Sequence, residues 1–351
     1  MTRRVAGRAV DKHVTDEEAA GRRSRAAGRR SRAAGPDRRR RPGRAAAPGR
    51  GGPSPLSHRR TRSRGGRRHG SYPYALYAPA ATVYLVIFLV PTVMAFYFSL
   101  TRWTLFDSTF VGLENFRDFL SEQNLRVGFQ NTIVYAVVTS GLKVVLGMAL
   151  GVLLTSSLRS RGFLRSVVFF PVLVSTVAVG ITFSMLLKPD TGLVDRALGL
   201  VGVDGRDWLG DATTALLSVA LVDVWKGVGL ATVIYIAGIV SIPGSYYEAV
   251  MVDGGTAWHG FRHVTLPLSW PATYSVIVLS FIGGLRTFDL IWTMTRGGPG
   301  FTSDTISSII YKQYQAGFYG LSTAGNVLLF LVVTALVVPL TYVLGKRQVA
   351  S

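Results

Sequence analysis

Six long apolar segments alternate with shorter polar stretches from residue 77 to the end of the chain. An α-helix needs about 20 apolar residues to cross the hydrocarbon core of a bilayer, and a buried helix of a soluble protein is usually shorter. The pattern therefore predicts an all-α, polytopic membrane protein with six transmembrane helices. The predicted spans are Tyr77–Leu100, Thr132–Leu154, Ser166–Leu187, Thr214–Ile242, Leu268–Met294 and Ala324–Leu344.

The composition agrees with this pattern and separates the chain into two parts. Of 351 residues, 48% are hydrophobic and only 17% are charged, and there is no cysteine, which excludes disulfides and thiolate metal sites but does not identify a compartment. The net charge of +20 belongs to the N-terminal part, because residues 1–70 hold 22 of the 39 basic residues and only five of the 19 acidic ones. Charge thus says little about the apolar remainder.

Residues 1–72 are predicted to be a disordered, Arg-rich cytoplasmic tail. Arg, Ala, Gly, Pro and Ser dominate, and the heptapeptide GRRSRAA occurs twice, at 21–27 and 28–34. Such a segment buries too little apolar surface to offset its ordering entropy. No aromatic residue precedes Tyr72 to stack on bases, so contact with anionic lipid is favoured over nucleic acid. The tail lacks the apolar stretch of a signal peptide, and a misplaced start site is the other explanation for part of it.

Basic residues in the short loops predict the orientation. The loop between the second and third spans carries Arg159, Arg161 and Arg165 without an acid, and Lys346 and Arg347 follow the sixth span. Together with the basic tail they place both termini in the cytoplasm. The loop between the fourth and fifth spans is then cytoplasmic as well.

That loop, residues 245–267, is too polar and too long for a simple turn. We expect Ser245 to cap a short helix that contains Glu248, and Gly254 with Gly255 to end it. A second short helix, Thr256–Val264, should stop before Pro267. An interfacial turn lying on lipid would favour Lys and Arg, yet the first half is acidic, which indicates a protein partner. The candidate contact residues are Glu248, Ala249, Asp253 and Phe261.

The same loop resembles the EAA loop of ABC importer permeases. Glu248-Ala249-Val250 matches Glu-Ala-Ala, Gly254 follows at the family spacing, and Val264-Thr265-Leu266-Pro267 matches the Ile-x-Leu-Pro ending, with Val250, Gly255 and Val264 as mild departures. Outside the loop, SLTRWTLF, GLENF, FQNTI and FDLIWTMTRGGPG are similar to sugar permeases of the maltose and glycerol-phosphate type. The resemblance covers about Tyr74–Arg347 and implies a type I ABC importer permease domain over residues 73–347.

The resemblance also implies a mechanism and partners. Such permeases pair with a second homologous permease, two cytoplasmic ATPase subunits and an external solute-binding protein in a bacterial inner or plasma membrane. It assigns ATPase coupling to Glu248, which meets an arginine of the ATPase, and to Ala249, Asp253, Gly254, Phe261 and Pro267. The chain has no G-x-x-x-x-G-K-[ST] loop, so ATP and Mg²⁺ are expected on the partner, with no cofactor or enzymatic activity here.

Ionisable residues inside spans are costly and are candidates for function. Asp223 and Lys226 lie three residues apart, as do Arg286 and Asp289, and internal ion pairs and solute contact are equally open readings of both pairs. Resemblance to maltose-type permeases implies a solute cavity lined by residues of the third to fifth spans. Val172 lies at one of these contact positions, and the predicted solute-binding residues are Thr176, Asp223, Lys226, Gly227, Ser280, Gly284 and Thr287. Lys143 is alone in the second span and should snorkel or face a cavity.

The class that competes most directly with an ABC permease is an ion-coupled secondary transporter. It would need inverted repeats and broken helices, and no internal symmetry is seen in the sequence. A membrane enzyme is disfavoured because no nucleophile–base pair or metal cluster is present. His259 and His263 have metal-capable spacing, but no third ligand follows. The sequence does not identify the sugar.

Overall fold

The computed structural model describes residues 77–104, 106–202 and 205–349, and the predicted tail of residues 1–72 lies outside them. The first span begins with α1 (Ala78–Tyr84), passes through a π-helical turn (Leu85–Leu89) and ends with α2 (Val90–Ser99). A short antiparallel hairpin of β1 (Thr101–Trp103) and β2 (Ser108–Phe110) follows, with Thr101 opposite Phe110. The helix α3 (Glu114–Ser121) leads into the long helix α4 (Gln123–Thr155).

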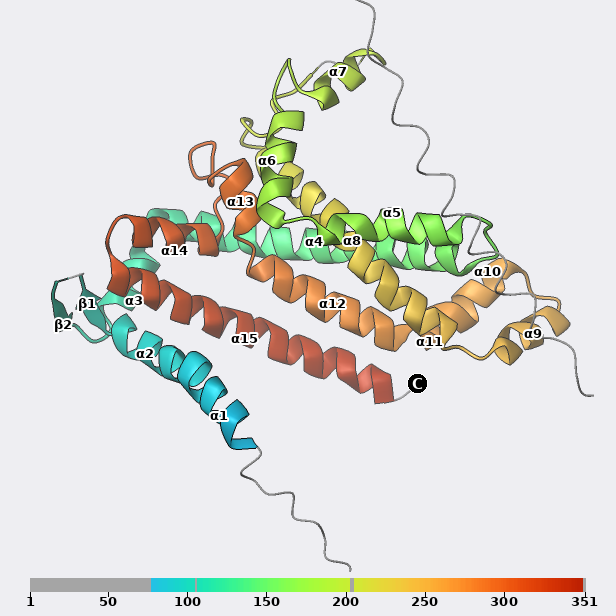
Figure 1. The fold of residues 1–351 in the computed structure, drawn as a ribbon, viewed down its shortest axis with the longest axis horizontal. Coiled ribbons are helices and arrows are strands. Elements are labelled where there is room, and N and C mark those ends of the chain that lie inside the picture. The colour runs from blue at the N-terminus through green and yellow to red at the C-terminus, as the bar shows by residue number, and fades with distance from the viewer. Residues whose placement is uncertain (1–76, 105, 203–204, 350–351) are drawn as a thin grey trace, which may run out of the picture. The chain divides into compact units, whose positions relative to one another are not determined.

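Three helices form the centre of the bundle (Figure 1): α4, α8 (Ala215–Val240) and α12 (Trp270–Leu285). Small residues let α4 and α8 approach closely, because a Cβ at Gly147 would lie 2.8 Å from the Ala231 Cβ and one at Gly151 would lie 2.7 Å from the Tyr235 Cβ. The last helix, α15 (Tyr319–Val349), packs on α2, α3, α12 and the amphipathic helix α14 (Ile306–Gln315).

By length and hydropathy, four helices of the described ranges are able to cross a membrane: Ala78–Ser99, Gln123–Thr155, Ala215–Val240 and Tyr319–Lys346. They coincide with the first, second, fourth and sixth predicted spans. Two further pairs of helices pass the same test only when the two helices of a pair, which are joined at a sharp bend, are counted as one span. With both pairs included, the number of spans is up to six.

The third and fifth predicted spans are therefore not single straight helices. The third is divided into α5 (Arg161–Leu173) and α6 (Thr176–Leu186), which meet at 99° because Val174 and Ser175 are extended. The fifth was predicted to reach Met294, but α12 ends at Leu285 and a separate helix, α13 (Asp289–Met294), follows. Both breaks are stabilised by packing between the broken pieces, since α6 contacts α13. The short helix α7 (Leu193–Gly199) lies beyond α6.

Candidate functional site

The loop between α8 and α12 begins with α9 (Gly244–Val252). Pro243 occupies the position before the helix, and no side chain caps it, so the predicted capping role of Ser245 with Glu248 is wrong. Proline presets the extended backbone that the entry requires, which makes a side-chain cap unnecessary there. Glu248 is exposed and forms no ion pair or hydrogen bond with another described residue, so its carboxylate is free.

Gly254 ends α9, as predicted. Its φ of +76° is a left-handed conformation that a residue with a Cβ rarely adopts. The Gly254 N–H donates to the Met251 carbonyl at 3.1 Å and the Gly255 N–H donates to the Val250 carbonyl at 2.8 Å, which is the Schellman pattern. Asp253 is the last residue before this turn and is exposed.

The second helix of the loop starts as predicted but runs further. Thr256 and His259 form a capping box at the start of α10 (Ala257–Gly260). The chain then continues through a π-helical turn (Phe261–Thr265) and α11 (Leu266–Leu268), so Pro267 lies within the helix and the predicted stop is wrong. Proline cannot donate an α-helical bond, and the wider π turn just before it accommodates that loss. The axis bends by 62° only at Ser269, where α12 begins.

Apolar side chains surround the free carboxylates of the loop. Met251 is 66% exposed, Val252 is 86% exposed and Trp258 is 63% exposed, next to the exposed Glu248 and Ala249. Exposed apolar residues beside acids are typical of a protein contact. Phe261 was predicted, with Ala249, to be an apolar contact, but Phe261 is half-buried against the bundle, and Tyr246 and Trp258 are exposed aromatic residues of the loop.

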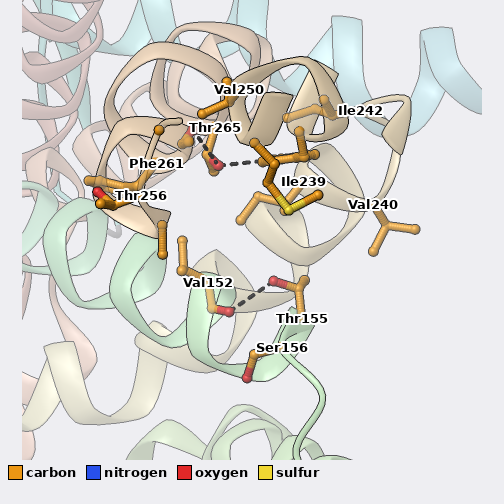
Figure 2. A pocket seen from close by; sticks show the side chains of 15 residues that line it. Val152, Thr155, Ser156, Ile239, Val240, Ile242, Val250, Thr256, Phe261 and Thr265 are labelled. Atoms are coloured by element: carbon orange, nitrogen blue, oxygen red, sulfur yellow. Dashed lines mark hydrogen bonds between the residues drawn. The ribbon is translucent and has the colours of Figure 1, made fainter. Parts of the chain in front are cut away.

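A pocket of about 610 Å³ separates this loop from the ends of α4 and α8. Figure 2 shows Val152 and Thr155 of α4 on one side, and Val250 and Phe261 of the loop on the other. Across the loop itself, the Tyr247 hydroxyl and the Thr265 hydroxyl lie 3.0 Å apart and connect α9 to the π turn. The two helical parts of the loop are thus connected to each other, while a pocket lies between the loop and the bundle. This arrangement suits an element that moves as a unit.

At the centre of the bundle, a buried ion pair joins α4 to α8. The Lys143 Nζ donates to Asp223 Oδ2 at 2.8 Å, and the two side chains are 10% and 22% exposed. Asp223 therefore pairs across helices and not with Lys226, which forms no ion pair among the described residues. The Lys143 pairing was missed because the two residues are 80 positions apart.

The ion pair lines a small cavity of about 160 Å³ together with Gly227 and Ser280. A Cβ at Gly227 would lie 2.6 Å from the Lys143 Cε, so a side chain there would displace the end of Lys143 from its place beside Asp223. The buried Tyr135 hydroxyl has no hydrogen-bond partner of good geometry among the described residues, but the Asp223 carboxylate and the Thr287 side chain both lie close enough to act on it. Three predicted solute residues, Asp223, Gly227 and Ser280, thus come together with a cation and a buried hydroxyl nearby.

The other predicted solute residues do not line this cavity. Thr176 is the first residue of α6, at the 99° bend, four residues after Val172 of α5. Gly284 is a packing residue, since a Cβ there would lie 2.6 Å from the Ala136 Cα. Thr287 lies in the break after α12, where its carbonyl accepts a bond from the Thr305 hydroxyl. Arg286 and Asp289 flank that break and form no ion pair with each other or with another described residue, so their expected common helix face does not exist.

The GGPG segment after α13 is held by a buried carboxylate that the sequence did not single out. Asp304 accepts from Lys312 Nζ at 2.6 Å and from the Ser308 hydroxyl at 2.8 Å. Burial raises the pKa of Asp304, and the bonds from Lys312 and Ser308 oppose that rise. Gly297 has a φ of +86° and lies directly against this carboxylate, which leaves no room for a Cβ.

A helical membrane bundle with an exposed acidic loop at one end and a polar cavity at its centre is the arrangement expected of a membrane transport protein. Comparison with known families makes the assignment specific. Residues 143–349 match the family described as "Binding-protein-dependent transport system inner membrane component". The chain belongs to this family of ABC importer permeases.

Individual relatives and one solved structure agree with the family. The trehalose/maltose transport system permease protein MalF of Thermococcus litoralis is 32% identical over 268 residues, 76% of this chain and 91% of that one. The arabinooligosaccharides transport system permease protein AraP of Bacillus subtilis is 29% identical over 271 residues, 76% of this chain and 86% of that one. A bacterial ABC transporter that imports alginate has the same fold, with a TM-score of 0.70 at 22% identity over 78% of this chain and 94% of that one.

Proposed function

We propose that this protein is the permease subunit of an ABC importer for a saccharide, and that it moves its solute by alternating access. Family membership supports the transport role, and the names of the relatives support a sugar, because they include maltose, trehalose and arabinooligosaccharide systems. The observation that carries the mechanism is the free Glu248 carboxylate on a projecting, internally tied loop.

In this proposal the loop from α9 to α11 transmits movement from a separate ATPase. Glu248 and Asp253 form charge pairs with the ATPase, and Ala249, Met251 and Trp258 fill an apolar cleft in it. Gly254 sets the angle between the two short helices. Phe261 and Pro267 act on the bundle side, where they connect the loop to α12.

The cavity around Asp223 and Lys143 is the proposed solute contact of the bundle. A carboxylate and an ammonium group side by side offer both acceptors and donors to sugar hydroxyls. Solute binding would replace part of the ion pair, so the charges need not be exposed to lipid at any stage. Ser280 and the space left by Gly227 complete the proposed contact, and Thr176, Lys226, Gly284 and Thr287 remain proposed members of the pathway.

The partners follow from the same proposal. A second homologous permease completes the pathway, two ATPase subunits bring ATP and Mg²⁺, and an external binding protein delivers the saccharide. A solved alginate ABC transporter of this fold is in complex with a periplasmic protein that carries an alginate pentasaccharide, which supports the binding-protein part of the proposal. Both termini are proposed to lie in the cytoplasm, on the side of the coupling loop. An ion-coupled transporter is the weaker alternative, because it assigns no role to the free acidic loop.

The test is uptake by the complete complex in proteoliposomes, with trehalose, maltotriose and arabinotriose as probes. We expect Glu248→Lys to lower uptake and to weaken co-purification with the ATPase, since losing a buried interfacial charge contact costs about 2–5 kcal/mol. Asp118→Lys is the matched control, because Asp118 is an exposed acid of α3 at the opposite end. Unchanged uptake and assembly with Glu248→Lys would exclude the coupling role.

A further inference from the structure

The end of α2, the strand β1, the helix α14 and the start of α15 lie at the end of the bundle opposite α9 and α10 (Figure 1). Six aromatic rings form a continuous series there. Successive ring centroids are 4.5, 5.6, 5.3, 6.2 and 5.0 Å apart. The series runs through Phe98, Trp103, Tyr319, Tyr314, Tyr311 and Phe288. These rings come from four different elements and from the break between α12 and α13, so the fold and not a local motif brings them together.

The inner end of this aromatic series opens into a pocket of about 450 Å³. Phe288, Tyr311 and Tyr314 supply ring surface to the pocket, and Arg286, Ser307 and Asn326 supply polar groups. A volume between about 300 and 1,000 Å³, aromatic walls and a few polar groups are the usual features of a small-molecule site. This pocket is separate from the cavity around Asp223, with which it shares no lining residue.

Several hydrogen-bonding groups at this pocket have no protein partner. The Arg286 guanidinium forms no ion pair with a described residue. The Tyr311 and Tyr314 hydroxyls, which belong to residues lining the pocket, form no hydrogen bond within the described ranges. Asn326 donates to the Ser322 carbonyl at 3.2 Å, which leaves its amide oxygen free to accept. The pocket thus offers a fork of donors, two hydroxyls and an acceptor around aromatic faces.

We propose that this pocket is an entry site that binds one glycosyl unit of the transported saccharide, and that the aromatic series guides the saccharide to it. The inference rests on the proposed function. A pyranose or furanose ring has an apolar C–H face, which packs on an aromatic ring, and an equatorial rim of hydroxyls, which suits Arg286 and Asn326. Rings that serve only as anchors at the membrane surface face lipid individually. Here neighbouring rings contact one another and three of them line a polar pocket.

The test compares two aromatic residues that are equally exposed at the same end of the bundle. Tyr314 is 54% exposed and lines the pocket, and Phe318 is 58% exposed and belongs neither to the pocket nor to the aromatic series. With the complete complex in proteoliposomes and maltotriose, trehalose or arabinotriose as substrate, we expect Tyr314→Ala and Arg286→Gln to raise KM about tenfold, as for the loss of one well-placed contact. Vmax and the amount of assembled complex should stay close to those of the unmodified protein.

Phe318→Ala should leave KM unchanged. If Tyr314→Ala and Phe318→Ala both lower the amount of assembled complex and leave KM alone, the rings anchor the protein in lipid and the entry site is excluded. An unchanged KM for Arg286→Gln and Tyr314→Ala together, in a complex that transports the sugar, also overturns the proposal. Failure of the unmodified complex to transport any of the three sugars would count against the proposed function itself. This outcome differs from failure of the entry site, in which the unmodified complex transports the sugar and the variants keep its KM.

Discussion

The loop between α8 and α12 and the cavity between α4 and α8 both display carboxylates, but under opposite physical conditions. Glu248 is exposed and unpaired in a surface loop, where leaving an ionised carboxylate in water costs nothing in folding. Asp223 is mostly buried in the bundle and is neutralised by Lys143 at 2.8 Å. An ionised group at that depth needs a partner, whether protein or solute. The Glu248 carboxylate is therefore available to another subunit. The Asp223 carboxylate is available only to a group that replaces the Lys143 ammonium.

The largest effect should come from breaking the buried pair. Asp223→Ala leaves the Lys143 ammonium buried without a partner, which should destabilise the protein by about 3–5 kcal/mol. We expect a lower midpoint of thermal unfolding for the purified complex and loss of uptake. Asp118→Ala removes an exposed acid of α3 outside the proposed ATPase contact and should leave the midpoint unchanged, which makes it the matched control for stability.

A double replacement separates folding from transport at the cavity. Lys143→Met with Asp223→Leu removes both charges and should recover most of the stability, because apolar replacement of a buried pair is often neutral or stabilising. If the pair contacts solute, uptake stays low in this stable variant. Recovery of uptake together with stability would show that the pair only holds α4 and α8 together.

Replacing a glycine by alanine adds a single methyl group, and two such replacements compare the cavity with another helix contact. Gly227→Ala places a Cβ 2.6 Å from the Lys143 Cε in the cavity, and such overpacking costs about 1–3 kcal/mol. We expect lower stability and weaker uptake, measured by thermal unfolding and by proteoliposome transport. Gly238→Ala is a control for overpacking away from the ion pair, since a Cβ there would lie 2.7 Å from the Ala272 Cβ. Equal loss of uptake in both variants would argue against a special role for the cavity.

Gly254→Ala acts on the loop through backbone conformation alone. No atom lies within 4 Å of its added Cβ, but its φ of +76° costs roughly 1–2 kcal/mol for a residue with a side chain. We therefore expect less ATPase-coupled uptake with little change in the unfolding midpoint of the bundle. Gly244→Ala is the control, because Gly244 also has open space around it and is not among the residues with positive φ. Normal coupling with Gly254→Ala would show that the turn angle is unimportant.

The comparison also explains what the sequence could and could not predict. The Gly254 turn depends on a few neighbouring residues, so their order along the chain was sufficient to predict it. The partner of Asp223 lies 80 positions away on another helix, and the nearer Lys226 was a misleading candidate. Straight spans followed from hydropathy, but the 99° break at Val174 and Ser175 contains neither glycine nor proline. Tertiary packing of α6 on α13 accompanies that break, and single-segment patterns do not contain such information.

Asp304 is an intermediate case, a buried carboxylate outside the spans with its own cation, and it should give the smallest effect. Burial raises its pKa, so between the ordinary carboxyl pKa and the raised one the folded state binds more protons than the unfolded state. Stability should thus increase as pH falls through this window, relative to Asp304→Asn. Asp211 provides the opposite sign, because bonds from Thr213 lower its pKa, and stability that depends on Asp211 should be lost as pH falls. Unfolding midpoints of the two Asn variants and the unmodified protein, measured from about pH 6 to about pH 2, should therefore diverge in opposite directions, above about pH 4 for Asp304 and below about pH 4 for Asp211. Parallel curves for Asp304→Asn and the unmodified protein would mean that water reaches Asp304, and that only Asp223 among these carboxylates behaves as a buried charge.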